Sequence, residues 1–423
     1  MLRNELKIIT DIGVHRAGED DQIRAMSFFR VVRHTMNGIL VAPYRTVLTA
    51  LASVVTLEAA LIASPFSVAA DVRSPAVIAL GDSYISGEGG RWQGNGEASM
   101  PGSRHGTDLA AYLCGPWETV CAHDPKRVYG TSYKNGCDRS SGAEITYVSQ
   151  VQLGGRIYAI SQPDRINVAC SGATTADIDQ STFKGEPRQV DQLLQYALAK
   201  DIKLIAVSIG GNDIQFRDMV GECVKDFITH GPYCNTTLAA ELSQRLVMMK
   251  DAVARSLHSI RAAMSQAGYR DADYRLVLQS YPSPVPPAAN NRYPETDWAR
   301  LHLGGCPIYN QDSDWAYGSA VPDVAKALRE VATAVGGVDF LDVSRALAGH
   351  EVCAKGVGQS GDGDSLRSPR SKSDSEWVRW IRGLQGETQE SAHPNAFGQQ
   401  QLGHCLAAAA LSTDRGGSCT NQG

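Results

Sequence analysis

Beyond residue 70, short apolar runs alternate with longer stretches in which apolar residues recur about every three or four positions. This alternation is typical of parallel strands joined by crossover helices, so the pattern predicts the α/β class. Five of the short runs are expected to be strands, and they end at Leu80, Cys170, Gly210, Ser280 and Val343. The clearest helical patterns cover residues 189–199, 239–266, 321–335 and 396–411.

The stretch 91–136 has neither pattern and is expected to be a long loop inserted into a single domain that covers 71–423. It combines aromatic residues, from Trp92 to Tyr133, with Cys114 and Cys121, and Cys137 follows directly after it. Long ordered loops in compact domains are often functional, which favours a disulfide-linked cover over one end of the sheet. The alternative is that the aromatic side chains only give this loop a small core of its own.

The first 70 residues are expected to be an N-terminal extension that ends in a signal peptide. An apolar span over 47–63 follows several arginines, and small residues lead up to Ala70 in the pattern of a signal-peptidase site. Asp71 is then the first mature residue, with cleavage after Ala69 as the alternative. A retained membrane anchor is disfavoured because Glu58 would be costly inside hydrocarbon. The sequence therefore predicts secretion.

Charge and cysteine content narrow the classes of partner and the compartment. The chain has a formal net charge of −5 with scattered lysines and arginines, so it has no basic stripe for nucleic acid. All ten cysteines follow the expected signal peptide, which is typical of an exported protein with disulfides. No Cys or His spacing favours a metal, and spacing alone leaves the disulfide pairing open. The cysteines are Cys114, Cys121, Cys137, Cys170, Cys223, Cys234, Cys306, Cys353, Cys405 and Cys419.

Polar and glycine residues follow three of the expected strands, where a parallel sheet gathers its ligands. Ser83 follows the first, Gly172 the second and Asn212 the third, and His393 precedes the last helix. A serine nucleophile needs a base, and its tetrahedral intermediate needs donors for the developing oxyanion. His393 is the candidate base and general acid. The backbone N–H groups of Ser83 and Gly172 and the side-chain amide of Asn212 are the candidate oxyanion donors.

These four stretches resemble the sequence blocks of the SGNH (GDSL) hydrolase family, in the same order. The blocks read GDSYISGEG around Ser83, ACSGATT around Gly172, SIGGNDIQF around Asn212 and SAHPN around His393. The second and last are similar to secreted actinobacterial esterases and lipases. The resemblance implies a three-layer, flavodoxin-like fold with a parallel sheet between helices. It also implies hydrolysis of esters through an acyl-enzyme, with no cofactor and no metal.

The resemblance also implies three disulfides, Cys137–Cys170, Cys223–Cys234 and Cys306–Cys353. Cys114 with Cys121, and Cys405 with Cys419, are then the cysteines left over. A tied Cys170 would anchor the loop that carries Gly172, so oxidation is expected to preorganise the oxyanion hole.

The sequence offers three candidates for the partner of His393. The family usually has Asp three residues before the histidine, where this chain has Glu390, whose longer side chain must fold back to reach Nδ1. The alternatives are Asp342, after the last expected strand, and a backbone carbonyl near residue 390. Asp82 and Asp213 are expected to hold the turns that carry Ser83 and Asn212.

Three functions remain open at this stage. The first is a secreted lipase or esterase that acts as a monomer on small-molecule or lipid esters, with transient contact with lipid surfaces. The second is a carbohydrate-deacetylating esterase, which needs a smaller and more polar pocket. The third is a non-catalytic envelope or binding protein on the same fold. No G-x-S-x-G, H-E-x-x-H or Walker sequence favours another hydrolase class.

Overall fold

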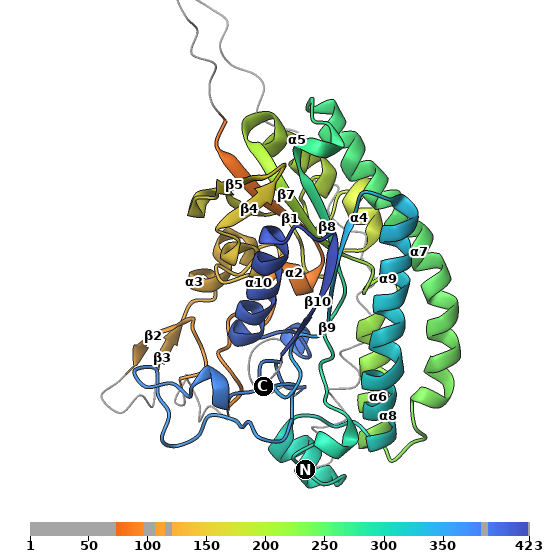
Figure 1. Ribbon diagram of the computed structural model, residues 1–423. Coiled ribbons are helices and arrows are strands. Elements are labelled where there is room, and N and C mark those ends of the chain that lie inside the picture. Colours follow the sequence, from red (N-terminus) through yellow and green to blue (C-terminus); the bar gives the residue numbers. More distant parts are fainter. Residues whose placement is uncertain (1–72, 97–105, 115–120, 382–387, 422–423) are drawn as a thin grey trace, which may run out of the picture. The chain divides into compact units, whose positions relative to one another are not determined.

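The structure is a computed structural model that describes residues 73–96, 106–114, 121–381 and 388–421 (Figure 1). The expected signal peptide lies outside these residues. Residues from Arg73 onward form one unit. Within the described residues, no helix has the length and apolar character required to cross a membrane.

A six-stranded sheet runs through this unit in the order β10-β9-β8-β7-β1-β6. All of its strand pairs are parallel, which confirms the α/β class. Each of the five expected strands is present, and β10 is an addition to them. The strands are β1 (Pro75–Gly81), β6 (Arg165–Asn167), β7 (Asp201–Ser208), β8 (Arg275–Gln279), β9 (Asp339–Arg345) and β10 (Gly416–Thr420).

Helices cover both faces of the sheet, and β1 shows why. Its side chains alternate between two separate buried clusters, with Ile78 and Leu80 in one and Val77 and Ala79 in the other. A strand buried on both faces needs a helical layer on each. The first face packs against α5 (Gln189–Ala199), α7 (Asn235–Gln266) and α9 (Val321–Val335). The second packs against α10 (Ala396–Leu411), which Figure 1 shows across the sheet from α7 and α9.

Shorter elements fill the connections between these layers. The segment 91–136, expected to be a loop, contains a small hairpin and one turn of helix. The short helices are α2 (Ser83–Ser86), α3 (Lys126–Tyr129), α4 (Thr175–Asp179), α6 (Phe216–Ile228) and α8 (Asn310–Trp315). The hairpin strands are β2 (Ala111–Cys114) with β3 (Cys121–His123), and β4 (Gln150–Leu153) with β5 (Arg156–Ala159).

Among the described residues, four disulfides connect these elements. The three expected from the resemblance are present, and Cys405 is bonded to Cys419. The last of these ties the edge strand β10 to α10. Cys114 and Cys121 lie opposite each other in the β2–β3 pair, and a bond between them remains a prediction.

Cys223, Cys234 and Asp312 form a group with the spacing of metal ligands. The two sulfur atoms of this group are bonded to each other. Asp312 accepts hydrogen bonds from the backbone N–H groups of Cys234 and Asn235. Asp312 therefore provides acceptors for backbone N–H groups at the start of α7, as a capping side chain does.

Candidate active site

Ser83 lies at the end of β1, at the first position of α2. Asp82 caps this short helix, because its carboxyl accepts a hydrogen bond from the N–H of Tyr84 at 3.1 Å. The hydroxyl of Tyr281 donates to the same carboxyl. Burial raises the pKa of Asp82 to about 7. The Asp82 carboxyl therefore contacts the turn that carries Ser83, and its supporting role remains a prediction.

The turn before Ser83 requires glycine at position 81. Gly81 has a φ of +139°, which is unfavourable for other residues. A Cβ atom here would lie 1.9 Å from the carbonyl oxygen of Ser208 on the neighbouring strand β7. The end of β1 can therefore approach β7 closely only because residue 81 has no side chain.

His393 contacts Ser83 although the two residues are far apart in the sequence. Its Nε2 atom lies 2.7 Å from Ser83 Oγ, and its Nδ1 atom lies 3.0 Å from the carbonyl oxygen of Ser391. A carbonyl can only accept, so Nδ1 carries a proton and Nε2 is free to accept the serine proton. Burial lowers the pKa of His393 to about 4, which keeps the imidazole neutral.

The loop before α10 fixes the position of the imidazole. Arg379 N–H donates to the carbonyl of His393 at 2.8 Å, and Ala392 N–H donates to the carbonyl of Arg379 at 2.9 Å. The hydroxyl of Tyr84 donates to the carbonyl of Ala392 at 3.0 Å. Asn395 caps α10 through the N–H groups of residues 397 and 398. These hydrogen bonds hold the backbone immediately before and after the His393 side chain.

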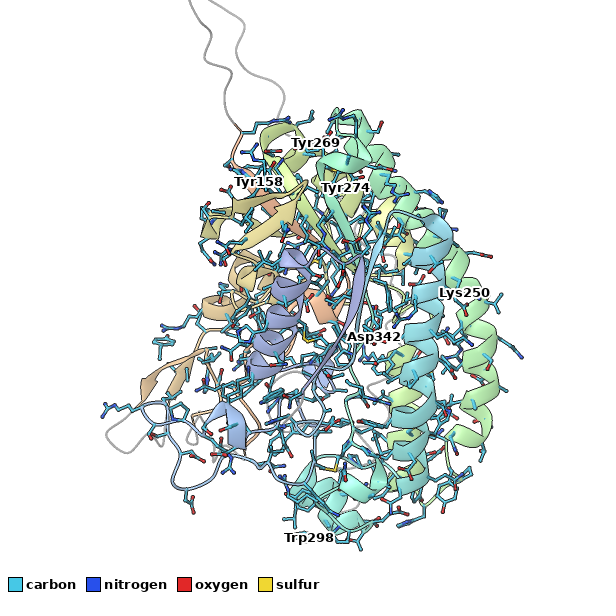
Figure 2. All side chains as sticks on the ribbon, in the orientation of Figure 1. Tyr158, Lys250, Tyr269, Tyr274, Trp298 and Asp342 are labelled. Atoms are coloured by element: carbon cyan, nitrogen blue, oxygen red, sulfur yellow. A yellow bond between two sulfur atoms is a disulfide. The ribbon has the colours of Figure 1, made fainter. Side chains whose placement is uncertain are left out.

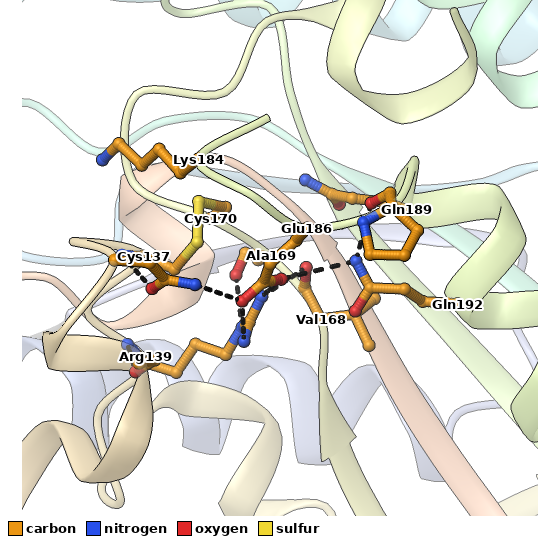
Figure 3. Close-up of polar contacts among 12 residues, drawn as sticks. Cys137, Arg139, Val168, Ala169, Cys170, Lys184, Glu186, Gln189 and Gln192 are labelled. Carbon is orange, nitrogen blue, oxygen red and sulfur yellow. Dashed lines mark hydrogen bonds and ion pairs between the residues drawn. A yellow bond between two sulfur atoms is a disulfide. The ribbon is translucent and has the colours of Figure 1, made fainter. Parts of the chain in front are cut away.

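The loop that carries Gly172 is braced from several directions, and Figure 3 shows the contacts that Cys170 and Arg139 make there. The Cys137–Cys170 disulfide attaches the start of this loop to the segment around Cys137. Arg139 donates to the carbonyl of Ala169 at 2.7 Å and forms an ion pair with Glu186. Gly172 itself has a φ of +82°, which favours glycine at this position.

Asn212 lies beside the Gly172 loop. Its Nδ2 atom donates to the carbonyl of Ala173 at 2.9 Å, which leaves the second N–H of the amide for another acceptor. Asp213 accepts from the N–H of Thr175 at 3.1 Å and also from its hydroxyl. The two carboxyl-end loops are therefore joined to each other next to Gly172.

The two candidate carboxylates have other partners. Glu390 accepts from Trp92 Nε1 and from the Tyr129 hydroxyl, each at 2.7 Å. Both partners come from the segment 91–136, so Glu390 fastens this segment to the loop of His393. Asp342, labelled in Figure 2, accepts from Ser280 and pairs with Arg329 of α9 at 2.9 Å. The atom in contact with Nδ1 of His393 is the carbonyl oxygen of Ser391, the backbone alternative considered from the sequence.

Sequence reasoning missed Glu88 as a residue of this site. Its Oε2 atom lies 2.6 Å from Ser171 Oγ and 3.6 Å from His393 Nε2. Glu88 belongs to the same GDSYISGEG stretch as Ser83, and an acidic residue between two glycines was the available signal. Only the fold shows that this carboxyl turns inward.

Comparison with known proteins identifies related sequences and structures. The sequence model of the GDSL-like Lipase/Acylhydrolase family matches residues 128–401. This range contains Gly172, Asn212 and His393, and Ser83 lies before it. No curated protein matches the chain.

Several solved structures are similar over most of the chain. An extracellular lipase from Streptomyces rimosus is 20% identical, with a TM-score of 0.43, over 80% of this chain and 100% of that one. Phospholipase A1 from Streptomyces albidoflavus is 17% identical, with a TM-score of 0.46, over 81% and 100%. Est24, a carbohydrate acetylesterase from Sinorhizobium meliloti, is 11% identical, with a TM-score of 0.32, over 80% and 98%.

Proposed function

The chain belongs to the GDSL-like lipase/acylhydrolase family and is a carboxylic ester hydrolase, and on this premise we propose that it acts through an acyl-enzyme on Ser83. The observation that carries the proposal is the 2.7 Å contact between Ser83 Oγ and His393 Nε2. A serine hydroxyl becomes a competent nucleophile when a base lies within hydrogen-bond reach.

The reaction begins when Nε2 of His393 takes the proton of Ser83 and Oγ attacks the ester carbonyl carbon. The developing oxyanion accepts hydrogen bonds from the N–H groups of Ser83 and Gly172 and from the second N–H of Asn212. His393 then gives its proton to the leaving alcohol. Water activated by the same imidazole releases the acid and restores Ser83.

We infer that a dyad, not a triad, performs this chemistry. The carbonyl of Ser391 fixes the tautomer and orientation of His393, which is the work that a carboxylate does in a Ser-His-Asp triad. Glu390 supports the site without contacting the imidazole through its carboxylate, because this carboxylate connects Trp92 and Tyr129 to the loop that carries His393.

Covalent labelling by a fluorophosphonate tests the proposal most directly. We expect the oxidised protein to react with the probe, and Ser83→Ala to show no reaction. His393→Ala should lower kcat/KM for a p-nitrophenyl ester by about 10³-fold or more. Failure of the unaltered protein to react, where a known serine esterase does, would exclude the mechanism and favour a non-catalytic binding protein.

We propose a lipase or esterase specificity with an apolar acyl group. Two half-buried phenylalanines lie next to residues of the site: Phe183 lies 3.6 Å from a Cβ built on Gly172, and Phe216 contacts the ring of Tyr84 edge-on. Such rings offer an apolar surface to an acyl chain. In a series of p-nitrophenyl esters from acetate to palmitate, we expect a maximum beyond acetate. A maximum at acetate would favour the carbohydrate-deacetylating alternative.

We also propose that the enzyme is exported and works as a monomer. Four disulfides are typical of proteins that mature in an oxidising compartment. N-terminal sequencing of the protein from the culture medium should begin at Asp71, or at Ala70 if cleavage follows Ala69. An intact N-terminus in a membrane fraction would contradict export.

A further inference from the structure

Glu88 occupies a buried position next to the reacting atoms. Gly87 and Gly89, on either side of it, have φ values of +92° and +84°, which turn the chain back on itself after α2. A Cβ on Gly89 would lie 3.2 Å from Cβ of His393. The chain at position 89 therefore approaches the histidine loop closely, and the side chain of Glu88 is only 1% exposed.

One oxygen of the Glu88 carboxyl group lies close to both Ser171 and His393. Oε2 accepts a hydrogen bond from Ser171 Oγ at 2.6 Å and lies 3.6 Å from His393 Nε2. The other oxygen, Oε1, is buried and has no hydrogen-bond partner among the described residues. A buried carboxylate with an unpaired oxygen is costly, which favours the protonated form at rest.

Burial and the charged groups around Glu88 together set the pKa of its carboxyl, and some of these groups raise it while others lower it. Asp138 and Glu390 raise its pKa, Lys184 and the Ser171 hydroxyl lower it, and burial has the largest effect, so that the pKa is about 8. Glu88 in turn raises the pKa of the Tyr129 hydroxyl. The imidazole of His393 completes this environment.

We propose that Glu88 is a positioning residue that adjusts the proton affinity of His393 and holds Ser171, and with it the Gly172 loop, against the imidazole. The proposal deepens the proposed function and rests on it. When Ser83 loses its proton to Nε2, a positive charge appears 3.6 Å from Oε2. An ionised Glu88 stabilises this imidazolium, whereas a protonated Glu88 does so only weakly.

The pH dependence of the reaction reports this effect. His393 is unprotonated over the whole range above about pH 5, because its pKa is about 4. A second rise in kcat/KM, centred at about pH 8 where Glu88 loses its proton, is therefore expected. We expect this rise to be about tenfold, which corresponds to about one unit of proton affinity on the imidazole.

The variant Glu88→Gln keeps the shape of the side chain and removes its ionisation. We expect kcat/KM for p-nitrophenyl acetate in this variant to lack the alkaline rise, since Gln resembles the protonated acid. Glu144→Gln is the matched control. Glu144 is also buried, and its pKa is also about 8. Its carboxyl accepts a hydrogen bond from Gln279, whereas that of Glu88 lies beside Ser171 and His393. The control should keep the rise.

Ser171→Ala provides a second test that does not depend on the stability of Glu88→Gln. The Ser171 hydroxyl lowers the pKa of Glu88, so its removal should move the alkaline rise to higher pH. A rise that stays in Glu88→Gln, or that does not move in Ser171→Ala, would overturn the role of Glu88. Loss of the rise in both Glu88→Gln and Glu144→Gln would overturn it as well.

Fluorophosphonate labelling separates this inference from the proposed function. If the unaltered enzyme is not labelled at any pH, the nucleophile itself is wrong and the inference fails with it. If Ser83 is labelled and the labelling rate has no alkaline rise, only the role of Glu88 is refuted. Labelling rates that rise near pH 8 in the unaltered enzyme, and not in Glu88→Gln, support both.

Discussion

His393 and Glu88 share a buried environment that moves their pKa values in opposite directions. Loss of hydration disfavours the charged form of each group, so the pKa of the imidazole falls to about 4 and that of the carboxyl rises to about 8. Both groups are neutral around neutral pH. At the scale of the residue, burial therefore leaves Nε2 able to accept the proton of Ser83.

We expect activity to persist in acid below the ordinary histidine range. The imidazole is a base only when it is unprotonated, so kcat/KM should fall as the pH falls through about 4. The unfolded chain takes up this proton already near its ordinary pKa of 6.5, so folding stability should decrease as the pH falls below that value. Initial rates in overlapping buffers, with circular dichroism at each pH, measure the two effects separately. A kinetic midpoint near 6.5 with the fold intact would contradict the prediction.

Glu390→Gln tests whether this carboxylate takes part in catalysis. A glutamine has one acceptor oxygen, so either Trp92 or Tyr129 loses its acceptor, and the free energy of unfolding should fall by about 1–3 kcal/mol. In the proposed dyad the Ser391 carbonyl orients the imidazole, so kcat/KM should stay within about tenfold of the unaltered enzyme. Urea unfolding and p-nitrophenyl ester kinetics measure the two quantities. A kinetic loss as large as that of His393→Ala would instead place Glu390 in the catalytic machinery.

At the scale of the elements, most of the fold follows from hydrophobic periodicity. The expected helices 189–199, 321–335 and 396–411 have these same bounds in the structure, and α7 begins four residues earlier than expected, at Asn235. β10 gave no such signal, because Cys419 is the only hydrophobic residue in its Gly-Gly-Ser-Cys-Thr sequence. Its place in the sheet depends on pairing with β9 and on the Cys405–Cys419 disulfide.

Gly81→Ala should disrupt the junction of β1 and β7. The added Cβ would lie 1.9 Å from the carbonyl oxygen of Ser208, in backbone that cannot give way without losing strand pairing. We expect a loss of about 3 kcal/mol or more in unfolding free energy, or failure to fold. Gly221→Ala in α6 is the control, because no atom lies within 4 Å of its built Cβ. It should stabilise the protein by about 0.5–1 kcal/mol. Equal effects of the two substitutions in thermal or urea unfolding would refute this account.

At the scale of the whole molecule, disulfides connect segments that are separated in the sequence. Cys137–Cys170 closes 33 residues and lies next to the Gly172 loop, whereas Cys405–Cys419 closes 14 residues at the sheet edge. Loop-closure entropy gives both bonds a similar stabilisation, about 3–4 kcal/mol. Their positions predict different effects on activity.

Replacing each pair by serines tests this difference. Both double variants should be less stable by about 3–4 kcal/mol. Only Cys137→Ser with Cys170→Ser should also lower kcat, by about tenfold or more, because the proposed oxyanion donor at Gly172 loses its anchor. Denaturant unfolding and ester kinetics below the transition measure both effects. Equal kinetics in the two variants would show that the disulfide does not preorganise the site.

The sequence by itself determined the α/β class, five strands of the sheet, the long helices and the candidate residues Ser83, Gly172, Asn212 and His393. These follow from local periodicity and from short motifs, which depend on neighbouring residues. Only the tertiary structure decided which carbonyl contacts Nδ1 of His393, where Glu390 binds and that Glu88 faces the imidazole. Each of these depends on contacts between segments far apart in the chain, and burial, not residue type, sets the charge of the groups that meet there.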